Sequence, residues 1–155
     1  MVFLKNYFIN TTLEVDFLPI TSDVKYAIRD ANGKDGLVTV AIPGAGASVI
    51  VFEPIKEVID ELKTVIEMFA GEKEHCIDKR KEQVMLAPRI QTAIFGRFVS
   101  LPIKDGRLML DPYEEIYLID FDKKIRRREF FVQVMSQDAQ AAQAAPKGQP
   151  LQKKK

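Results

Sequence analysis

The segment GLVTVAIPGAGASVIVFE, residues 36–53, decides the fold expected for this chain. Two apolar, β-branched runs flank the sequence Pro43-Gly44-Ala45-Gly46, which predicts a hairpin of two strands, at 37–42 and 47–52, joined by a tight glycine turn. Glu53 ends the segment and is its first side chain that is able to do chemistry. We therefore expect any functional site to include this segment.

The composition is that of a single globular domain. The chain has 155 residues, of which 46% are hydrophobic and 29% charged, so a full core is available, and we expect one domain over residues 1–135. Residues 136–155 hold four lysines, one aspartate and no aromatic residue, which predicts a disordered or weakly helical tail that ends in lysines.

The location is expected to be cytoplasmic. Cys76 is the single cysteine, which excludes an intramolecular disulfide and a metal site built from several thiolates. The opening MVFLKNYFIN is too short and too mixed for a signal peptide, and no apolar run approaches the length of a membrane span. We therefore expect no membrane partner.

The charge distribution argues against a nucleic-acid partner. The formal net charge is +1 and the tail contributes +3, which leaves residues 1–135 near −2. Arg126, Arg127 and Arg128 form the one dense basic cluster before the tail, and strand alternation sends Arg127 to the face opposite the other two. The alternative is a tail that binds nucleic acid through its lysines, for which binding would be sensitive to salt.

The remaining patterns predict an α+β fold. Strands are predicted at 2–8 and 13–18, paired as a hairpin or lying as neighbours, followed by a helix that Thr21 or Ser22 caps. Apolar residues at steps of three and four predict a long helix from Pro54 to Phe69, and a shorter helix is expected over 89–95. Further strands are predicted at 98–103, 107–110, 116–121 and 128–135. This order indicates a mixed, mostly antiparallel, sandwich-like sheet with two main helices.

No single motif defines a chemistry. The glycine turn lacks the Gly-Lys-Ser/Thr of a Walker loop and the third glycine of a dinucleotide fingerprint. Gly44 and Gly46 either supply the positive φ of a turn or let backbone N–H groups approach a ligand. His75 is the single histidine and is expected on a charged surface loop, while Glu53 and Glu114 either meet in space or are solvated. We expect no metal site and no cofactor.

A series of short motifs between residues 17 and 135 resembles one known family. The motifs are Phe17-Leu18-Pro19-Ile20-Thr21, Gly36-Leu37-Val38, Pro43 with the run to Glu53, Gly96 with Leu101-Pro102-Ile103, Gly106-Arg107-Leu108-Met109-Leu110, and Asp120-Phe121-Asp122 with following arginines. In order and spacing they resemble the YjbQ-like proteins, some of which are described as secondary thiamine-phosphate synthases. The resemblance implies an α+β sandwich-like subunit that assembles as a homotrimer.

The polar residues of the family's site are changed in this chain. Residues 44–46 stand where the family has His-Thr-Thr, and Arg89 stands where it has a later histidine. Glu114 falls in the family's Gly-Thr-Trp-Gln, and Lys123-Lys124 replace the Gly-Pro of its terminal Asp-Gly-Pro-Arg. The lost histidines are the residues best suited to bind a metal or move protons at neutral pH.

These changes predict a non-catalytic ligand-binding or structural paralogue with an altered family site and a small anionic ligand. The residues expected to line that site are Gly44, Ala45, Gly46, Glu53, Arg89, Glu114, Arg126 and Arg127. The alternative is a thiamine-phosphate synthase-like enzyme that acts on a phosphate ester. In that enzyme Arg89 would bind phosphate, and Glu53 would be the catalytic acid or base.

Overall fold

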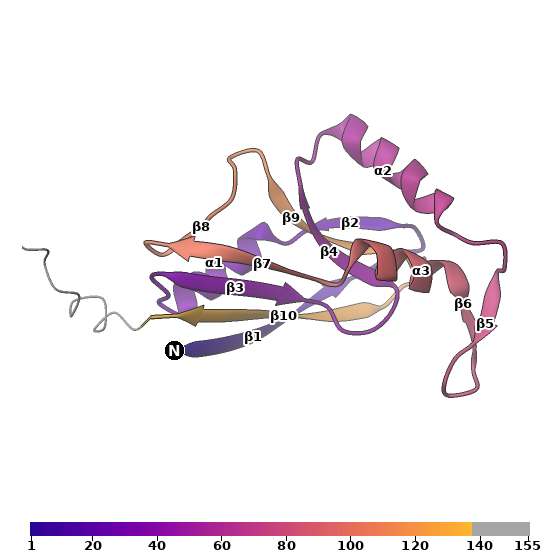
Figure 1. Ribbon diagram of the computed structural model, residues 1–155, viewed down its shortest axis with the longest axis horizontal. Helices are drawn as coiled ribbons and strands as arrows, with labels where there is room; N and C mark the ends of the chain where they lie inside the picture. Colours follow the sequence, from indigo (N-terminus) through magenta and orange to yellow (C-terminus); the bar gives the residue numbers. More distant parts are fainter. Residues whose placement is uncertain (138–155) are drawn as a thin grey trace, which may run out of the picture.

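The chain folds into two antiparallel β-sheets that pack face to face (Figure 1). The computed structural model describes residues 1–137, so the tail predicted for 136–155 lies almost wholly outside the described residues. The larger sheet has the strand order β1-β10-β3-β7-β8. Its strands are β1 (Val2–Asn10), β10 (Arg127–Ser136), β3 (Gly36–Ala41), β7 (Phe98–Lys104) and β8 (Arg107–Leu108).

The smaller sheet has the strand order β2-β9-β4, and a separate two-stranded hairpin extends from the body. The strands of the smaller sheet are β2 (Asp16–Pro19), β9 (Glu115–Asp120) and β4 (Ala47–Phe52), and those of the hairpin are β5 (His75–Ile77) and β6 (Gln83–Met85). The helices are α1 (Thr21–Asp30), α2 (Lys56–Met68) and α3 (Leu86–Phe95).

The main core lies between the two sheets. Alternate residues of β3 and β10, among them Val40 and Phe130, are fully buried and meet Leu118 of β9 in one apolar cluster. The ring of Tyr7 from β1 stacks on Phe130 with centroids 5.5 Å apart. Val24 and its neighbours on α1 complete this cluster. Burial of alternate strand residues therefore holds the sandwich together.

A second apolar cluster lies on the other face of the smaller sheet, below α2 and α3. It is built from Ile119 and Phe121, with Ile66 of α2 and Phe95 of α3 packed against them. Ile66 is the one buried residue of α2, although the apolar stripe of that helix is much longer. Most of the stripe on α2 is therefore left uncovered within one subunit.

The predicted fold class is confirmed. Every strand pairing within residues 1–137 is antiparallel. A hairpin turn at Asp105-Gly106 joins β7 to β8, as the Asp-Gly pair between the predicted strands indicates, and both residues have positive φ. The third helix begins at Leu86, three residues before the predicted start, because Pro88 is tolerated in a first helical turn. The domain boundary at 135 stays a prediction, and β10 continues to Ser136.

Two predicted strand pairings are wrong. The strands at 36–41 and 47–52 do not form a hairpin, because β3 pairs with β10 and β7 whereas β4 pairs with β9. The glycine segment between them instead carries the chain from one sheet to the other. Likewise β1 pairs with β10 and β2 with β9, so the first two strands lie in different sheets. Apolar patterning predicts strands well but does not say which layer each strand joins.

The predicted cap of α1 is also wrong. The Thr21 hydroxyl accepts a hydrogen bond from the backbone N–H of Ile116 at 2.9 Å, and no side chain caps the helix, whose N-cap position is Ile20. Thr21 therefore fastens α1 to β9. The long helix begins at Lys56 and not at Pro54, since the backbone of Ile55 is still extended.

The fully buried ring of Phe130 gives a direct test of this core. Phe130→Ala should lower the free energy of unfolding by about 3–5 kcal/mol, because the truncation leaves a cavity between the sheets. The matched control is Tyr113→Ala, at a ring that is 76% exposed, for which we expect a change within about 0.5 kcal/mol. Urea unfolding at one fixed protein concentration measures both, and equal losses would contradict this description of the core.

Candidate functional site

A polar hollow of about 580 Å³ opens beside the glycine segment that joins the two sheets. Segments that are distant in sequence meet there: the turn after β3, the β5–β6 hairpin, α3, and the loop from β9 into β10. The lining residues are Gly44, Ala45, His75, Arg80, Glu82, Gln83, Val84, Met85, Arg89, Asp122, Lys124, Arg126 and Arg128. Five of them are cationic and two are acidic, so the hollow is suited to an anion.

The glycine segment is anchored on both sides of the hollow. The N–H of Gly46 donates to the hydroxyl of Thr92 on α3 at 2.8 Å, and its carbonyl accepts from the N–H of Phe121 at 2.8 Å. Gly46 has φ +110°, and a Cβ there would lie 2.6 Å from a carboxylate oxygen of Asp122. Glycine is therefore required at this position on two independent grounds. Gly44, with φ +96°, has open space where a Cβ would point.

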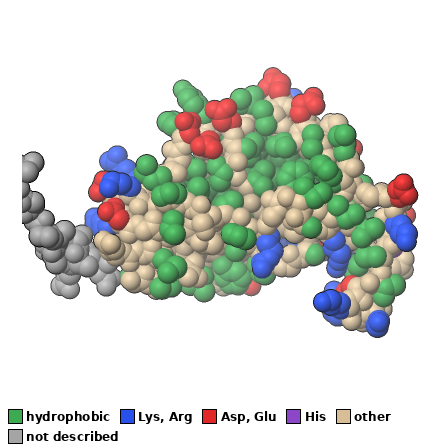
Figure 2. Space-filling model, viewed as in Figure 1, with side chains coloured by type: hydrophobic (Ala, Val, Ile, Leu, Met, Phe, Trp, Pro, Cys, Tyr) green, Lys and Arg blue, Asp and Glu red, His purple; other side chains and the backbone are tan. Residues whose placement is uncertain are grey.

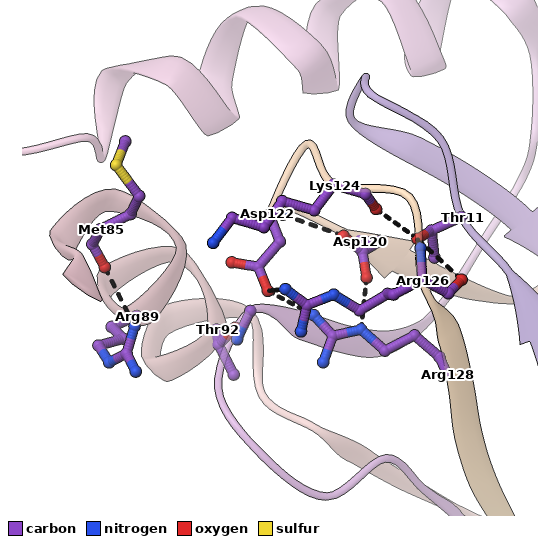
Figure 3. A network of polar contacts seen from close by, with 10 residues as sticks. Thr11, Met85, Arg89, Thr92, Asp120, Asp122, Lys124, Arg126 and Arg128 are labelled. Carbon is purple, nitrogen blue, oxygen red and sulfur yellow. Dashed lines mark hydrogen bonds and ion pairs between the residues drawn. The ribbon is translucent and has the colours of Figure 1, made fainter. Parts of the chain in front are cut away.

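An ion-pair network forms one wall of the hollow (Figure 3). Arg128 donates from Nε to Asp120 Oδ2 at 2.6 Å and from Nη2 to Asp122 Oδ2 at 2.8 Å. The same Asp122 oxygen lies 3.1 Å from Nη2 of Arg126. Asp120 is fully buried, whereas the Arg126 side chain is 36% exposed. Arg128 is therefore structural, and Arg126 still presents charge to the hollow.

Thr11, the residue that follows β1, fixes the loop that carries these groups. The Thr11 hydroxyl donates to the carbonyl of Lys124 at 2.6 Å and accepts from the N–H of Arg126 at 3.1 Å. Thr11 is itself buried. The backbone at residues 124–126 is thus fixed, while the Lys124 side chain is left exposed.

The opposite wall is the tip of the β5–β6 hairpin, which Asp78 organises. Its carboxylate accepts hydrogen bonds from the backbone N–H groups of Glu82 and Arg80 and from the Arg80 guanidinium, all between 2.8 and 3.0 Å. The Glu82 backbone first, and Arg80 second, hold the pKa of the Asp78 carboxyl below its usual value of 3.8. A depressed pKa means that this stabilisation is present above pH 3.8 and is lost as the pH falls below it.

Two cations in the hollow have no acidic partner in the part of the chain that the structure describes. Arg89 donates from Nη1 only to the backbone carbonyl of Met85 at 3.2 Å, and the Lys124 ammonium makes no ion pair. Unpaired charges near other cations are costly unless solvent or an anion compensates them. They are the strongest indication of what the hollow would bind.

The residues expected at the site fall into two groups. Gly44, Ala45, Arg89 and Arg126 line the hollow, and Gly46 lies directly behind it. The remaining residues, Glu53, Glu114 and Arg127, do not line it.

The two glutamates lie at the far end of the smaller sheet. β4 has six residues, so at ~3.3 Å per residue its two ends are about 20 Å apart. Glu53 follows that strand at the end opposite Gly46, and Glu115 pairs with Phe52, which places Glu114 at the same end. Arg127 points to the other face of β10, where its guanidinium lies 3.9 Å from the ring centroid of Phe8. The alternation predicted for the arginine cluster is thus seen.

Several residues of the hollow were not predicted from the sequence. His75, expected on the surface, is exposed and lies at the margin of the hollow. Arg80 and Lys124 were not singled out, since charged residues in loops give no signal of where they converge. The pairing of Asp120 with Arg128 could have been suspected, because both residue types are rarely buried unless paired.

The two antiparallel sheets with helices packed against them form an α+β sandwich of the YjbQ-like class. The family model for the UPF0047 protein YjbQ-like family matches residues 5–137. The chain belongs to the UPF0047 YjbQ-like family.

Its relatives are described only by family. UPF0047 protein MJ1081 of Methanocaldococcus jannaschii is 27% identical over 136 residues, which are 85% of this chain and 94% of that protein. A YbjQ-like protein of unknown function from Sulfolobus solfataricus P2 has a TM-score of 0.77 at 17% identity, over 88% of this chain and 99% of its own. An uncharacterised YjbQ/UPF0047 protein of Clostridium acetobutylicum has a TM-score of 0.74 at 22% identity, over 84% of this chain and 99% of its own. The two solved structures therefore share the fold.

Two features are absent from residues 1–137, the part of the chain that the structure describes. Within them no three or more His, Cys, Asp or Glu side chains are placed to hold a metal ion. The helices in the same residues are too short and too polar for any of them to cross a membrane.

Two glycine substitutions test the packing behind the hollow. Gly46→Ala should lower the free energy of unfolding more than Gly44→Ala, because both require a strained positive φ but only the Gly46 variant forces a Cβ against Asp122. The strain alone should cost about 1–2 kcal/mol at each position. Urea unfolding of the two variants side by side measures the difference, and a Gly44→Ala loss equal to that of Gly46→Ala would refute the close contact.

Proposed function

We propose that this YjbQ-like protein binds a small anion in the hollow and does not catalyse a reaction there. The proposal rests on two cations of the hollow, Arg89 and Lys124, that have no acidic partner within residues 1–137. Cations outnumber acids in the lining by five to two. Arg126 adds a third, partly compensated charge. A phosphate or carboxylate placed among them would gain charge-assisted hydrogen bonds.

The altered family site supports the absence of catalysis. The turn that carries His-Thr-Thr in the resembled family offers only backbone groups at Gly44 and Ala45 here, and these line the hollow. Arg89 replaces the later histidine with a group that stays protonated at all ordinary pH values. Such a group holds an anion well but does not exchange protons with it.

Phosphate binding tests the proposal. Arg89→Met and Lys124→Met should each weaken the binding of inorganic phosphate by about tenfold or more, as expected for the loss of one charge-assisted hydrogen bond. Titration calorimetry at constant ionic strength measures the change. The matched control is Arg29→Met, because Arg29 stacks on Tyr26 of α1 away from the hollow and should leave phosphate binding unchanged. Phosphate binding that is absent, or equal in all three variants, would overturn the proposal.

The second candidate is an enzyme of the thiamine-phosphate synthase type. It is favoured by the retention of Pro43 and Glu53 at their positions in the resembled motif, and by Arg89 in the hollow as a phosphate ligand. Because Glu53 and the hollow lie at opposite ends of β4, this enzyme would need the Glu53 of a second subunit at each site.

Turnover separates the two candidates. We expect no phosphate ester to form when the purified protein is incubated with thiamine precursors. If the unmodified protein forms product and the Glu53→Gln variant does not, the chain is an enzyme that uses Glu53. An unchanged rate in Glu53→Gln would remove Glu53 from the mechanism, and the exposed Glu57→Gln on α2 is the matched control for a surface carboxylate.

We also propose that the chain forms a homotrimer in the cytoplasm. The assembly follows from the family resemblance, and the uncovered stripe of α2 supports it. The location is supported by the single cysteine, Cys76, which forms no disulfide within the chain.

A further inference from the structure

The outward side of the larger sheet carries an unusual surface, which we call the sheet face. It is formed by the outward-pointing residues of four neighbouring strands, β1, β10, β3 and β7, which stand in register. These residues are Val2, Leu4 and Asn6 of β1, Phe131, Gln133 and Met135 of β10, Leu37, Thr39 and Ala41 of β3, and Phe98, Ser100 and Pro102 of β7. Val2, Met135, Leu37 and Pro102 form its first row. The exposed fractions are 64% for Val2, 50% for Leu37 and 63% for Phe98.

The sheet face contains no ionisable side chain. An antiparallel sheet with one solvated side normally alternates apolar inward and polar outward residues, yet here Leu4, Leu37, Phe98 and Met135 all point outward. α1 lies behind the sheet, and no other segment of residues 1–137 covers this side (Figure 1). Figure 2 looks onto it: hydrophobic and neutral surface fills the middle, and charged groups lie toward the margins. Depletion of charge is characteristic of the centre of protein interfaces.

The apolar stripe of α2 is a second surface without a partner. Ile55, just before the helix, is 50% exposed, and Val58, Val65 and Met68 are 38%, 37% and 76% exposed. Figure 2 shows hydrophobic side chains gathered below α2, beside the sheet face. A helix with an apolar stripe must bury it against another element to be stable in water.

The charges around the two surfaces are complementary. α2 carries four acids, Glu57, Asp60, Glu61 and Glu67, against two lysines. The margin of the sheet face carries three cations, Lys104, Arg107 and Arg127, against two acids, Asp35 and Glu129. Both carboxylates already accept hydrogen bonds at 2.8 Å, Asp35 from the N–H of Asp105 and Glu129 from Asn6. If the sheet faces of two copies packed against each other, cations would oppose cations. If the α2 helices of two copies packed against each other, acids would oppose acids. Both arrangements are unfavourable.

We propose that α2 of one copy of this chain packs on the sheet face of a second copy. A contact of this kind uses different surfaces on its two sides, so it is heterologous and closes into a ring when the rotation between copies allows. The inference rests on the proposed homotrimer, for which it supplies the interface. It is independent of the anion proposal, because no residue that lines the hollow lies on α2 or on the sheet face.

Paired charge substitutions test the interface. Leu37→Asp places a charge on the sheet face and Val65→Asp places one on α2, and a desolvated unpaired carboxylate at either position should prevent association. Light scattering should give three times the 17.6 kDa of one chain for the unmodified protein and a single chain for each variant. Ile77→Asp, at an apolar residue 64% exposed in β5, is the matched control and should keep the unmodified mass.

Mixing the two variants gives the sharpest result. The Leu37→Asp variant keeps an intact α2 and the Val65→Asp variant keeps an intact sheet face, so an equimolar mixture should form a species of two chains. A single-chain mass for the unmodified protein, or an unmodified mass for Val65→Asp, would overturn the inference. Two single-chain variants that fail to combine would overturn it too, since they would indicate that each surface pairs with its own kind.

Folding and ligand binding are controlled separately. Circular dichroism should show the same spectrum for all variants. If Leu37→Asp or Val65→Asp does not fold, Phe98→Glu on the sheet face and Val58→Asp on α2 provide a second pair of variants for the same test. Phosphate titration of the Leu37→Asp variant distinguishes the two proposals. Retained phosphate binding with a single-chain mass supports the interface, whereas an unmodified mass overturns the interface whatever the phosphate result.

Discussion

Arg128 ties the two sheets together at the end where the hollow opens. The side chain leaves β10 of the larger sheet and donates to Asp120, the last residue of β9 in the smaller sheet, at 2.6 Å. Asp120 is fully buried and Arg128 is 9% exposed, so the pair is shielded from water. Removing one partner of such a pair leaves an uncompensated buried charge and typically costs about 3–5 kcal/mol. The closure of the sandwich at this end therefore depends on the pair remaining intact.

The position of this ion pair explains the geometry around it. Arg128 also donates to Asp122, and this hydrogen bond holds the Asp122 carboxylate against the backbone of Gly46. The crossing between the sheets must therefore be made by residues without a side chain at that point. The same carboxylate compensates part of the charge on Arg126. Arg89, on another element, receives no such compensation, and the electrostatic asymmetry of the hollow follows from the way the sheets are joined.

The sequence predicted the elements well and their assembly less well. Alternation and helical spacing located β3, β4 and α2 to within a residue or two, because local patterning reports which side of an element is apolar. It could not show that β3 and β4 belong to different sheets, since a strand buried in either layer has the same pattern. The length of β4, which the sequence did predict, separates Glu53 from the glycine turn in either topology. The expected site was consequently divided between the two ends of the smaller sheet.

The family resemblance implies a histidine where this chain has Arg89, and the two side chains differ in what they can do at a site. A histidine can gain or lose a proton near neutral pH, whereas an arginine guanidinium keeps its charge and offers a rigid fork of donors. Under the proposed function, Arg89 therefore attracts an anion and does not transfer a proton. The glycine turn likewise presents no acid-base side chain to the hollow, and the space beside Gly44 is open. Arg89 makes no hydrogen bond to the Arg128 network, so its charge can act on the hollow without disturbing the ion pair that joins the sheets.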